Sequence, residues 1–282
     1  MPFHSTDSTG STDPALDDRI ARLRQLAHAD TRLEGVLLYG SWTVGEADAH
    51  SDIEAYLYIQ DAHLADFDGP GFLAKLAPLK LAYTNMYGIL AVVFDDLMRG
   101  EFHLSPAGSG IEEVPTWQGM VHLPRPDDAV LLDRTGRLTR AARQLAAFRP
   151  PEPVSTAQRL TNELTNWTLM LTHVLERGEI ARAHALLHSV IAPQQLQLCR
   201  LLRNSTAHWL TPSRALEQDL PDGDLHRYVA TTATARDQDV RTAAHNSWRW
   251  TRDLAAEAAD RWTIHLPQEL HDQMSTRLNT PH

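Results

Sequence analysis

Residues 38–58 read LYGSWTVGEADAHSDIEAYLY, and this stretch contains two strand-like segments and a pair of acids. An apolar segment runs into Gly40-Ser41, a polar loop follows, and a second strand begins at Asp52. Residues i and i+2 of a strand point to the same face of a sheet. Asp52 and Glu54 are therefore expected to present two carboxylates side by side, with Ile53 turned into the core.

The residues on either side of the loop have the chemistry of a magnesium and phosphate site. Mutual repulsion between Asp52 and Glu54 is relieved by a hard dication such as Mg²⁺, which binds one or two carboxylates together with substrate phosphates. Gly40 lets backbone N–H groups approach a phosphate closely, and the hydroxyls of Ser41 and Thr43 are further donors. Asp52-Ile53-Glu54 by itself would instead indicate an edge strand with two solvated acids. The whole ordered set favours the nucleotide site.

Outward from this stretch, the first half of the chain mixes helical and strand patterns. Asp17–His28 has apolar residues at helical spacing, and Ile53–Ile59 alternates as a strand does. The segment 72–81 is predicted to be a short helix interrupted at Pro78. The other predicted strands are 35–39, 89–94 and 101–104.

A proline-rich segment separates this half from a helical one. RPPEPV, residues 149–154, contains three prolines, and Ser155 with Gln158 fits a capping box that would open a helix. The predicted fold class is α+β, a mixed-sheet domain followed by a helical bundle. The predicted parts are a flexible tail (1–13), a first domain (14–148), a linker (149–155) and a bundle (156–282). Its predicted helices are 156–177, 179–203, 213–219, 224–234, 236–262 and a last one after Pro267.

Composition and charge narrow the class of protein. Hydrophobic residues make up 43% and charged residues 22%, which is typical of a folding chain. No apolar run approaches the roughly 20 residues that span a bilayer. The polar N-terminus has no signal-peptide pattern and Cys199 is the single cysteine, so a cytoplasmic protein is expected. A net charge of −10 argues against binding nucleic acid and favours a neutral or cationic small acceptor.

The pattern G-S, spacer, D-x-[DE] resembles the signature of the DNA polymerase β-like nucleotidyltransferase superfamily. Further stretches resemble the lincosamide nucleotidyltransferases of antibiotic resistance, in the same order along residues 33 to about 275. They are YGSWTVGEADAHSDIE (39–54), NMYG (85–88), VVFDDLMRGEFHLSP (92–106), LERGEIARA (175–183), WL (209–210) and TTATARD (231–237).

This resemblance implies an adenylyltransferase that moves a nucleoside monophosphate from ATP, or another NTP, to a hydroxyl of a small antibiotic, most plainly a lincosamide, and releases pyrophosphate. It implies that Asp52 and Glu54 bind Mg²⁺, that Gly40 and Ser41 contact the triphosphate, and that Glu101 is the general base. Proton removal from the attacking hydroxyl is a task for a carboxylate, or for a second metal ion that such a carboxylate binds.

Several alternatives stay open at this level. Asp95 and Asp96 compete with Glu101 for the role of third carboxylate, and His103 is either an acceptor contact or a half-buried structural histidine. Much of the helical half departs from the family, so the acceptor could also be an aminoglycoside or a natural-product intermediate. The resemblance also implies a homodimer.

Two further alternatives change the class of protein. The Arg203-x4-His208 spacing resembles the ribonuclease motif of HEPN domains, which would indicate a toxin–antitoxin module acting on RNA or protein. A degenerate nucleotide-binding protein is the non-catalytic alternative. The set Asp52, Glu54 and Glu101 argues against it, because a module that only binds has no need of a base.

Overall fold

The computed structural model describes residues 14–279, and the chain folds into two compact units, Met1–Arg149 and Pro150–His282. The division falls inside the proline-rich segment. The predicted tail, residues 1–13, lies outside the described residues. The fold class expected from the sequence, a mixed sheet followed by a helical unit, is confirmed.

The first unit is built on a six-stranded mixed sheet with the order β3-β4-β5-β2-β1-β6. β2 pairs in parallel with β5, and every other neighbouring pair is antiparallel. β2 is therefore an interior strand, so the alternative of an edge strand carrying solvated acids is wrong. The strands are β1 (Leu33–Leu38), β2 (Ile53–Ile59), β3 (Leu79–Thr84), β4 (Leu90–Phe94), β5 (Arg99–Pro106) and β6 (Val130–Asp133).

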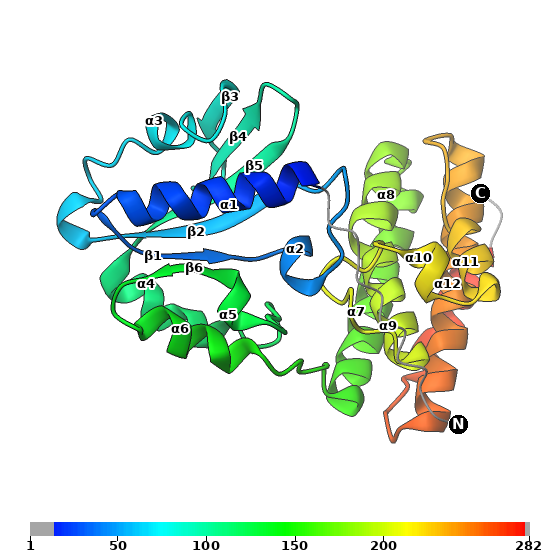
Figure 1. Ribbon diagram of the computed structural model, residues 1–282. Helices are drawn as coiled ribbons and strands as arrows, with labels where there is room; N and C mark the ends of the chain where they lie inside the picture. Colours follow the sequence, from blue (N-terminus) through cyan, green and yellow to red (C-terminus); the bar gives the residue numbers. More distant parts are fainter. Residues whose placement is uncertain (1–13, 280–282) are drawn as a thin grey trace. The chain divides into compact units, whose positions relative to one another are not determined.

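Helices cover both faces of this sheet (Figure 1). Helix α1 (Pro14–Ala29) buries Leu16, Ile20 and Leu23 in the core of one face, because residues three and four apart lie on one side of a helix. On the other face, α4 (Ala107–Glu113) and α6 (Arg137–Ala142) pack with Leu37 and Tyr58 in a second core. The shorter elements are η1 (Asp61–His63), η2 (Val114–Trp117), α5 (Pro126–Ala129) and η3 (Arg143–Leu145).

The predicted helix 17–28 and the predicted strands 35–39, 53–59, 89–94 and 101–104 are confirmed. The predicted helix over 72–81 is wrong. Helix α3 (Gly69–Leu73) begins earlier and is capped by the Asp68 carboxylate, which accepts a hydrogen bond from the Gly71 amide at 2.9 Å. The chain then turns at Pro78 into strand β3, which lies at the edge of the sheet. None of its residues is buried, so they carry no strand-like alternation of apolar side chains.

The second unit is a bundle in which α7, α9 and α12 share one hydrophobic core (Figure 1). Its core residues include Leu164, Leu196 and Leu254. α8 continues through one π-helical turn, η4, into α9. The elements are α7 (Pro153–Glu176), α8 (Ile180–Leu186), η4 (Leu187–Ile191), α9 (Ala192–Arg203), α10 (Leu216–Asp219), α11 (Asp222–Val229), α12 (Asp237–Arg261) and α13 (Gln268–Asn279).

The predicted capping box of Ser155 and Gln158 is wrong. The N-cap of α7 is Glu152, whose carboxylate accepts hydrogen bonds from the amides of Val154 and Ser155. The Ser155 hydroxyl also donates to Glu152, while Gln158 donates to the carbonyl of His265. Pro153 explains the earlier start, because a proline at the first helical position already has the helical φ and needs no N–H partner.

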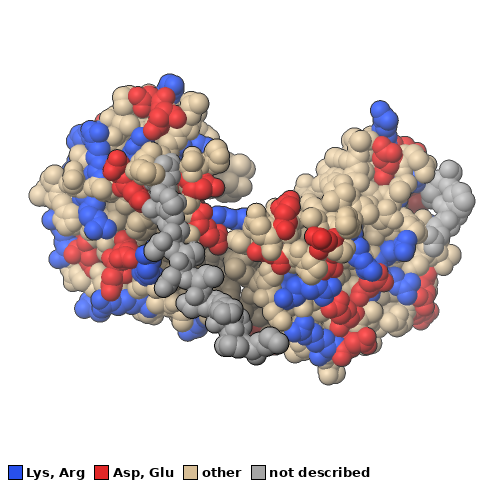
Figure 2. Space-filling view, turned by 45° about the vertical axis from the view of Figure 1, so that its right-hand side comes forward, with Lys and Arg blue, Asp and Glu red and all other residues tan. Residues whose placement is uncertain are grey.

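Within residues 14–279, no helix has the length and apolarity needed to cross a bilayer. Figure 2 shows acidic and basic side chains interspersed over the faces of both units that it presents. Neither of these faces carries the extended basic stripe that binding to a nucleic-acid backbone requires.

Candidate active site

The parallel pairing of β2 with β5 brings the three predicted carboxylates to one part of the sheet. Glu54 on β2 is in register with Glu101 on β5, and Asp52 lies two residues before Glu54. Residues in register on neighbouring strands lie on the same face, so all three side chains start from the same face. Ile53 between the acids is 1% exposed, as expected for the residue turned into the core.

Arg99 contacts two of these carboxylates, and the sequence interpretation had not singled it out. Its guanidinium lies 3.6 Å from Asp52 Oδ2 and 3.2 Å from Glu101 Oε1. Arg99 is two residues before Glu101 on β5, which places it on the same face and is the one sequence signal that could have indicated it. Its side chain is 62% exposed, so it can turn away from the acids into solvent. In this structure, Arg99 compensates part of the negative charge of the acidic group.

Gly40 lies directly against Glu54. A β-carbon added at Gly40 would stand 1.7 Å from Glu54 Oε2, which no real side chain tolerates. Gly40 also has a φ of +80°, a conformation that other residues rarely adopt. The Tyr39 amide beside it donates to the Glu54 carbonyl at 3.2 Å. The Gly-Ser turn and the acidic strand are therefore in contact, as a shared metal and phosphate site requires.

The two hydroxyl residues of the turn are placed differently. Ser41 begins the one-turn helix α2 (Ser41–Val44) immediately after Gly40 and is 8% exposed. Thr43 is 4% exposed, and its hydroxyl donates to the Gly40 carbonyl at 2.8 Å. The Thr43 hydroxyl therefore donates its hydrogen bond within the turn and fixes the conformation of Gly40. It is not directed at a phosphate in this structure.

His103 belongs to a row of aromatic side chains beside the carboxylates. Its ring stacks on Tyr56 with centroids 3.9 Å apart and planes 8° apart, and its Nε2 lies 3.1 Å from the Tyr39 hydroxyl. The Trp117 ring also contacts Tyr56, with ring centroids 4.6 Å apart, and so belongs to the same row. His103 is in register with Tyr56, just as Glu101 is with Glu54, so the aromatic row continues the acidic one along the same two strands.

The protonation states of His103 and Tyr39 follow from their surroundings. Burial lowers the pKa of His103 below its ordinary 6.5, so the ring is neutral at pH 7. Burial, followed by the negative charges of Glu54, Glu101 and Asp52, raises the pKa of Tyr39 well above its ordinary 10. A protonated Tyr39 and a neutral His103 therefore share one hydrogen bond, which fixes the ring beside the acids.

Asp95 and Asp96, the alternatives for the third carboxylate, lie in the turn between β4 and β5. Asp96 accepts hydrogen bonds from Arg19 at 2.7 Å and from the Met98 amide at 3.1 Å. Leu97, which follows them, has a φ of +69°, as a tight turn requires. Asp96 thus closes a turn and binds α1, and this arrangement favours Glu101 as the third acid.

The carboxylates do not converge as a complete metal cage. Within residues 14–279, no group of three or more His, Cys, Asp and Glu side chains is close enough to hold an ion. Asp52 and Glu101 instead flank Arg99, and Glu54 lies against Gly40. The donors are nevertheless all carboxylate oxygens, the ligands that Mg²⁺ prefers, and Mg²⁺ normally keeps several waters and substrate phosphates as its other ligands.

The Arg203-x4-His208 motif does not form one site. Arg203 forms ion pairs with Asp224 and Glu257, whereas His208 Nδ1 lies 2.6 Å from Asp219. Arg203 is the last residue of α9, and its guanidinium is held by acids of α11 and α12. Each side chain thus has its own acidic partners, which does not favour a ribonuclease centre.

Comparison with known proteins identifies the helical unit. Residues 154–277 match the family described as lincosamide nucleotidyltransferase-like, C-terminal domain. A search of curated proteins found no match. Among solved structures, an aminoglycoside 6-adenyltransferase from Bacillus subtilis aligns over 93% of this chain and 95% of that one, with a TM-score of 0.40 and 12% identity. Over residues 154–277 the helical unit is thus similar to the C-terminal domain of lincosamide nucleotidyltransferases, which bears out the resemblance and the predicted class of enzyme, a nucleotidyltransferase.

Proposed function

We propose that this protein is a Mg²⁺-dependent O-nucleotidyltransferase that transfers AMP from ATP to a hydroxyl of a small antibiotic, most plainly a lincosamide, and releases pyrophosphate. The observation that carries the proposal is the register of Glu54 with Glu101 beside Asp52, with the Gly40 turn in contact with Glu54. The match of the helical unit to the lincosamide nucleotidyltransferase-like family supports the choice of acceptor.

In this proposal Asp52 and Glu54 hold Mg²⁺, and Arg99 swings into solvent when the ion binds. Bound Mg²⁺ would neutralise the charge that develops on the phosphates during transfer. Arg99 is suited to give way because it is exposed and its contacts with Asp52 and Glu101 are ion pairs of small individual strength. The acids themselves stay in place, because both flank the buried Ile53 on an interior strand.

The triphosphate is assigned to Gly40 and Ser41. With no side chain at Gly40, a phosphate can approach the backbone next to Glu54, and the Ser41 hydroxyl follows directly on the turn. Thr43 acts through Gly40, whose carbonyl it binds, rather than on the nucleotide itself. ATP is the expected nucleotide, as the family resemblance implies.

Glu101 is the proposed general base. It lies across from Glu54, so an acceptor hydroxyl next to the nucleotide would be within reach of its carboxylate. His103, two residues further along β5, is assigned to the acceptor, together with the stacked Tyr56. Aromatic faces give an acceptor apolar contact area with little loss of side-chain freedom.

The remaining assignments concern partners and location. The acceptor is a small molecule with a free hydroxyl, and the net charge of −10 disfavours nucleic acid and anionic membrane surfaces as partners. We also assign the protein to the cytoplasm and expect it to be a homodimer. Sedimentation equilibrium checks the dimer, and a single species of 31.6 kDa would contradict it.

The test is mass spectrometry of a reaction containing the protein, Mg²⁺, ATP and lincomycin or clindamycin. A product heavier by one AMP is expected with the wild type and is expected to be absent with Asp52→Asn. Asp95→Asn is the matched control, because it removes an exposed acid of the same unit outside the site. If lincosamides give no product, the same assay on an aminoglycoside panel decides whether only the acceptor is wrong. No product with any acceptor and no Mg²⁺-dependent binding of ATP would refute the transferase.

A further inference from the structure

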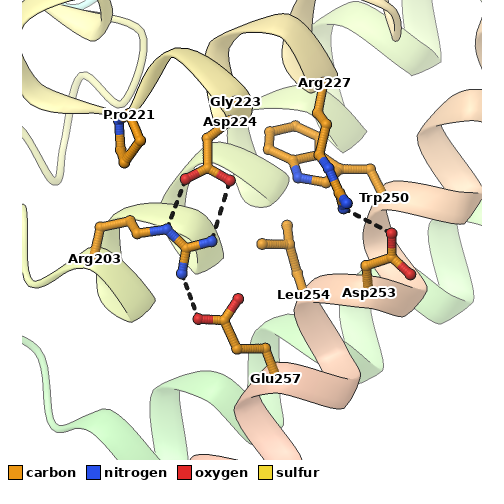
Figure 3. A pocket seen from close by; sticks show the side chains of 9 residues that line it. All are labelled: Arg203, Pro221, Gly223, Asp224, Arg227, Trp250, Asp253, Leu254 and Glu257. Atoms are coloured by element: carbon orange, nitrogen blue, oxygen red, sulfur yellow. Dashed lines mark hydrogen bonds and ion pairs between the residues drawn. The ribbon is translucent and has the colours of Figure 1, made fainter.

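The helical unit contains a cavity of about 390 Å³ that the proposed transferase site does not use (Figure 3). This volume is within the range of small-ligand pockets. Three segments build its wall: the end of α9, the first turns of α11 and the middle of α12. Its lining includes Arg203, Asp224, Arg227, Trp250, Asp253, Leu254 and Glu257.

The two arginines of the cavity are already occupied. Arg203 donates through Nε and Nη2 to Asp224 and through Nη1 to Glu257, and Arg227 donates to Asp253 at 2.7 Å. The hydrogen bonds that Arg203 donates to Asp224 and then to Glu257 raise its pKa well above the ordinary value. Three carboxylates against two guanidinium groups give the lining a net negative charge, so it does not suit an anionic ligand.

The carboxylates keep capacity to accept further hydrogen bonds. Glu257 uses Oε1 for Arg203 and Asp253 uses Oδ2 for Arg227, and a carboxylate can accept on both of its oxygens. The side chains of Asp253 and Glu257 are 59% and 45% exposed, so a ligand can reach them. They lie four residues apart on α12, on one side of the helix.

Trp250 supplies a buried, unsatisfied donor to the lining. The residue is 2% exposed, and within residues 14–279 its Nε1–H has no hydrogen-bond partner. In Figure 3 the indole nitrogen lies on the edge of the ring that is turned toward Asp224 and Leu254. A buried N–H without an acceptor destabilises the folded state, and a ligand oxygen in the cavity would remove that cost.

We propose that this cavity is a binding site for a small hydroxylated amine. The ammonium group binds Asp253 and Glu257, a hydroxyl or ether oxygen accepts the Trp250 N–H, and carbon atoms pack on Trp250 and Leu254. This combination of acceptors, one buried donor and an apolar wall distinguishes the ligand from a neutral sugar and from a phosphate. The site lies wholly within the helical unit and does not depend on the proposed transferase chemistry.

The test uses glucosamine as probe, with glucose as the neutral match of the same size. Indole ¹⁵N–H resonances of the seven tryptophans are recorded during each titration, and the Trp250 resonance is identified by its loss in Trp250→Phe. We expect glucosamine to move the Trp250 resonance in a saturable way and glucose to leave it unchanged. Saturation-transfer NMR then gives the Kd for each variant.

We expect Asp253→Asn to raise the Kd about tenfold and Trp250→Phe about fivefold, as the loss of a charge-assisted and of a neutral hydrogen bond predicts. Asp260→Asn is the matched control, with the same charge change elsewhere on α12, outside the lining of the cavity. Asp253 is exposed, so its variant tests the site even if Trp250→Phe destabilises the bundle. An unmoved Trp250 resonance, an equal response to glucose, or equal affinity in the two Asp variants would overturn the proposal.

Discussion

The Glu54 carboxylate lies against the α-carbon of Gly40, so closely that a β-carbon there would stand 1.7 Å from Oε2. This contact joins the turn proposed to bind phosphate to the strand proposed to bind the metal. Gly45, at the other end of α2, has nearly the same φ, +78° against +80°, but no atom lies within 4 Å of its β-carbon position. Gly45 is in the left-handed helical region with a ψ of 23°, whereas Gly40 has a ψ of −159°, a region essentially restricted to glycine, so Gly40 has both the greater backbone strain and the contact with Glu54.

Alanine at these two glycines should therefore have different effects. Gly45→Ala is expected to lower the free energy of unfolding by about 1–2 kcal/mol, the cost of a left-handed conformation, and to leave the affinity for Mg·ATP unchanged. Gly40→Ala has greater backbone strain and also displaces Glu54, so it should weaken Mg·ATP binding by at least about tenfold. Thermal unfolding and calorimetric titration check both values. Equal Mg·ATP affinity in the two variants would contradict a role for the Gly40–Glu54 contact.

Arg99→Gln should strengthen Mg²⁺ binding, because Arg99 competes with the ion for Asp52 and Glu101. Each exposed pair contributes at most about 1 kcal/mol, so we expect Mg²⁺ half-saturation at about a two- to fivefold lower concentration. Without Mg²⁺, the same variant should be slightly less stable than the wild type. Arg125→Gln is the control, since it breaks an exposed pair with Asp128 outside the site. Unchanged or weaker Mg²⁺ binding in Arg99→Gln would show that Arg99 does not occupy the place of the ion.

Tyr39→Phe removes the hydroxyl that holds the His103 ring in place and leaves the stacking on Tyr56 intact. We expect the KM for the acceptor to rise about three- to tenfold with kcat changed by less than about twofold, as for the loss of one neutral hydrogen bond. Tyr83→Phe, on the exposed strand β3, should change neither value. A fall in kcat without a change in KM would instead connect Tyr39 with the chemical step.

The fold was predictable where apolar and polar residues alternate with a clear period. Ile53–Ile59 alternates and lies between two partners, so both the strand and its acids were found. β3 was missed because none of its residues is buried, and β6 because its four residues are too few to show a period. The N-cap of α7 was misplaced because Glu152 precedes a proline, whereas the prediction relied on Ser155.

The site was predictable where its members lie close together in the sequence. Asp52 and Glu54 follow from the two-residue period of a strand, and Glu101 came only from the family resemblance. The ion pair between Arg99 and Asp52 depends on the register of two parallel strands that are far apart in the chain, which no local pattern specifies. The cavity around Trp250 likewise arises only when α9, α11 and α12 pack together.

Asp219 should stabilise the helical unit in a pH-dependent way. Burial alone would raise its pKa, but hydrogen bonds from Arg200 and His208 lower it below the ordinary 3.8. Asp219 therefore stabilises the folded state fully above its unfolded-state pKa, and this contribution is lost as pH falls through the lower folded-state value. Wild-type stability should thus decline at acid pH more steeply than that of Asp219→Asn.

At pH 7, Asp219→Asn should cost about 3–5 kcal/mol, because Arg200 is 0% exposed and would be left with an uncompensated charge. Asp237→Asn, which breaks an exposed i,i+4 pair with Arg241, should cost less than about 0.5 kcal/mol. Urea unfolding across a pH series measures both effects. Similar losses in the two variants would mean that the Arg200–Asp219 pair does not hold the unit together.

Calorimetric titration of a non-hydrolysable ATP analogue shows whether Asp52 and Glu54 form a Mg²⁺-dependent site for a nucleoside triphosphate. With Mg²⁺, the wild type and Asp95→Asn are expected to bind the analogue with equal affinity. Asp52→Asn and Glu54→Gln should each bind at least about tenfold more weakly, and without Mg²⁺ all four proteins should bind weakly and alike. Binding that is independent of Mg²⁺, or as strong in Asp52→Asn and Glu54→Gln as in the wild type, would mean that these two carboxylates do not hold the metal ion.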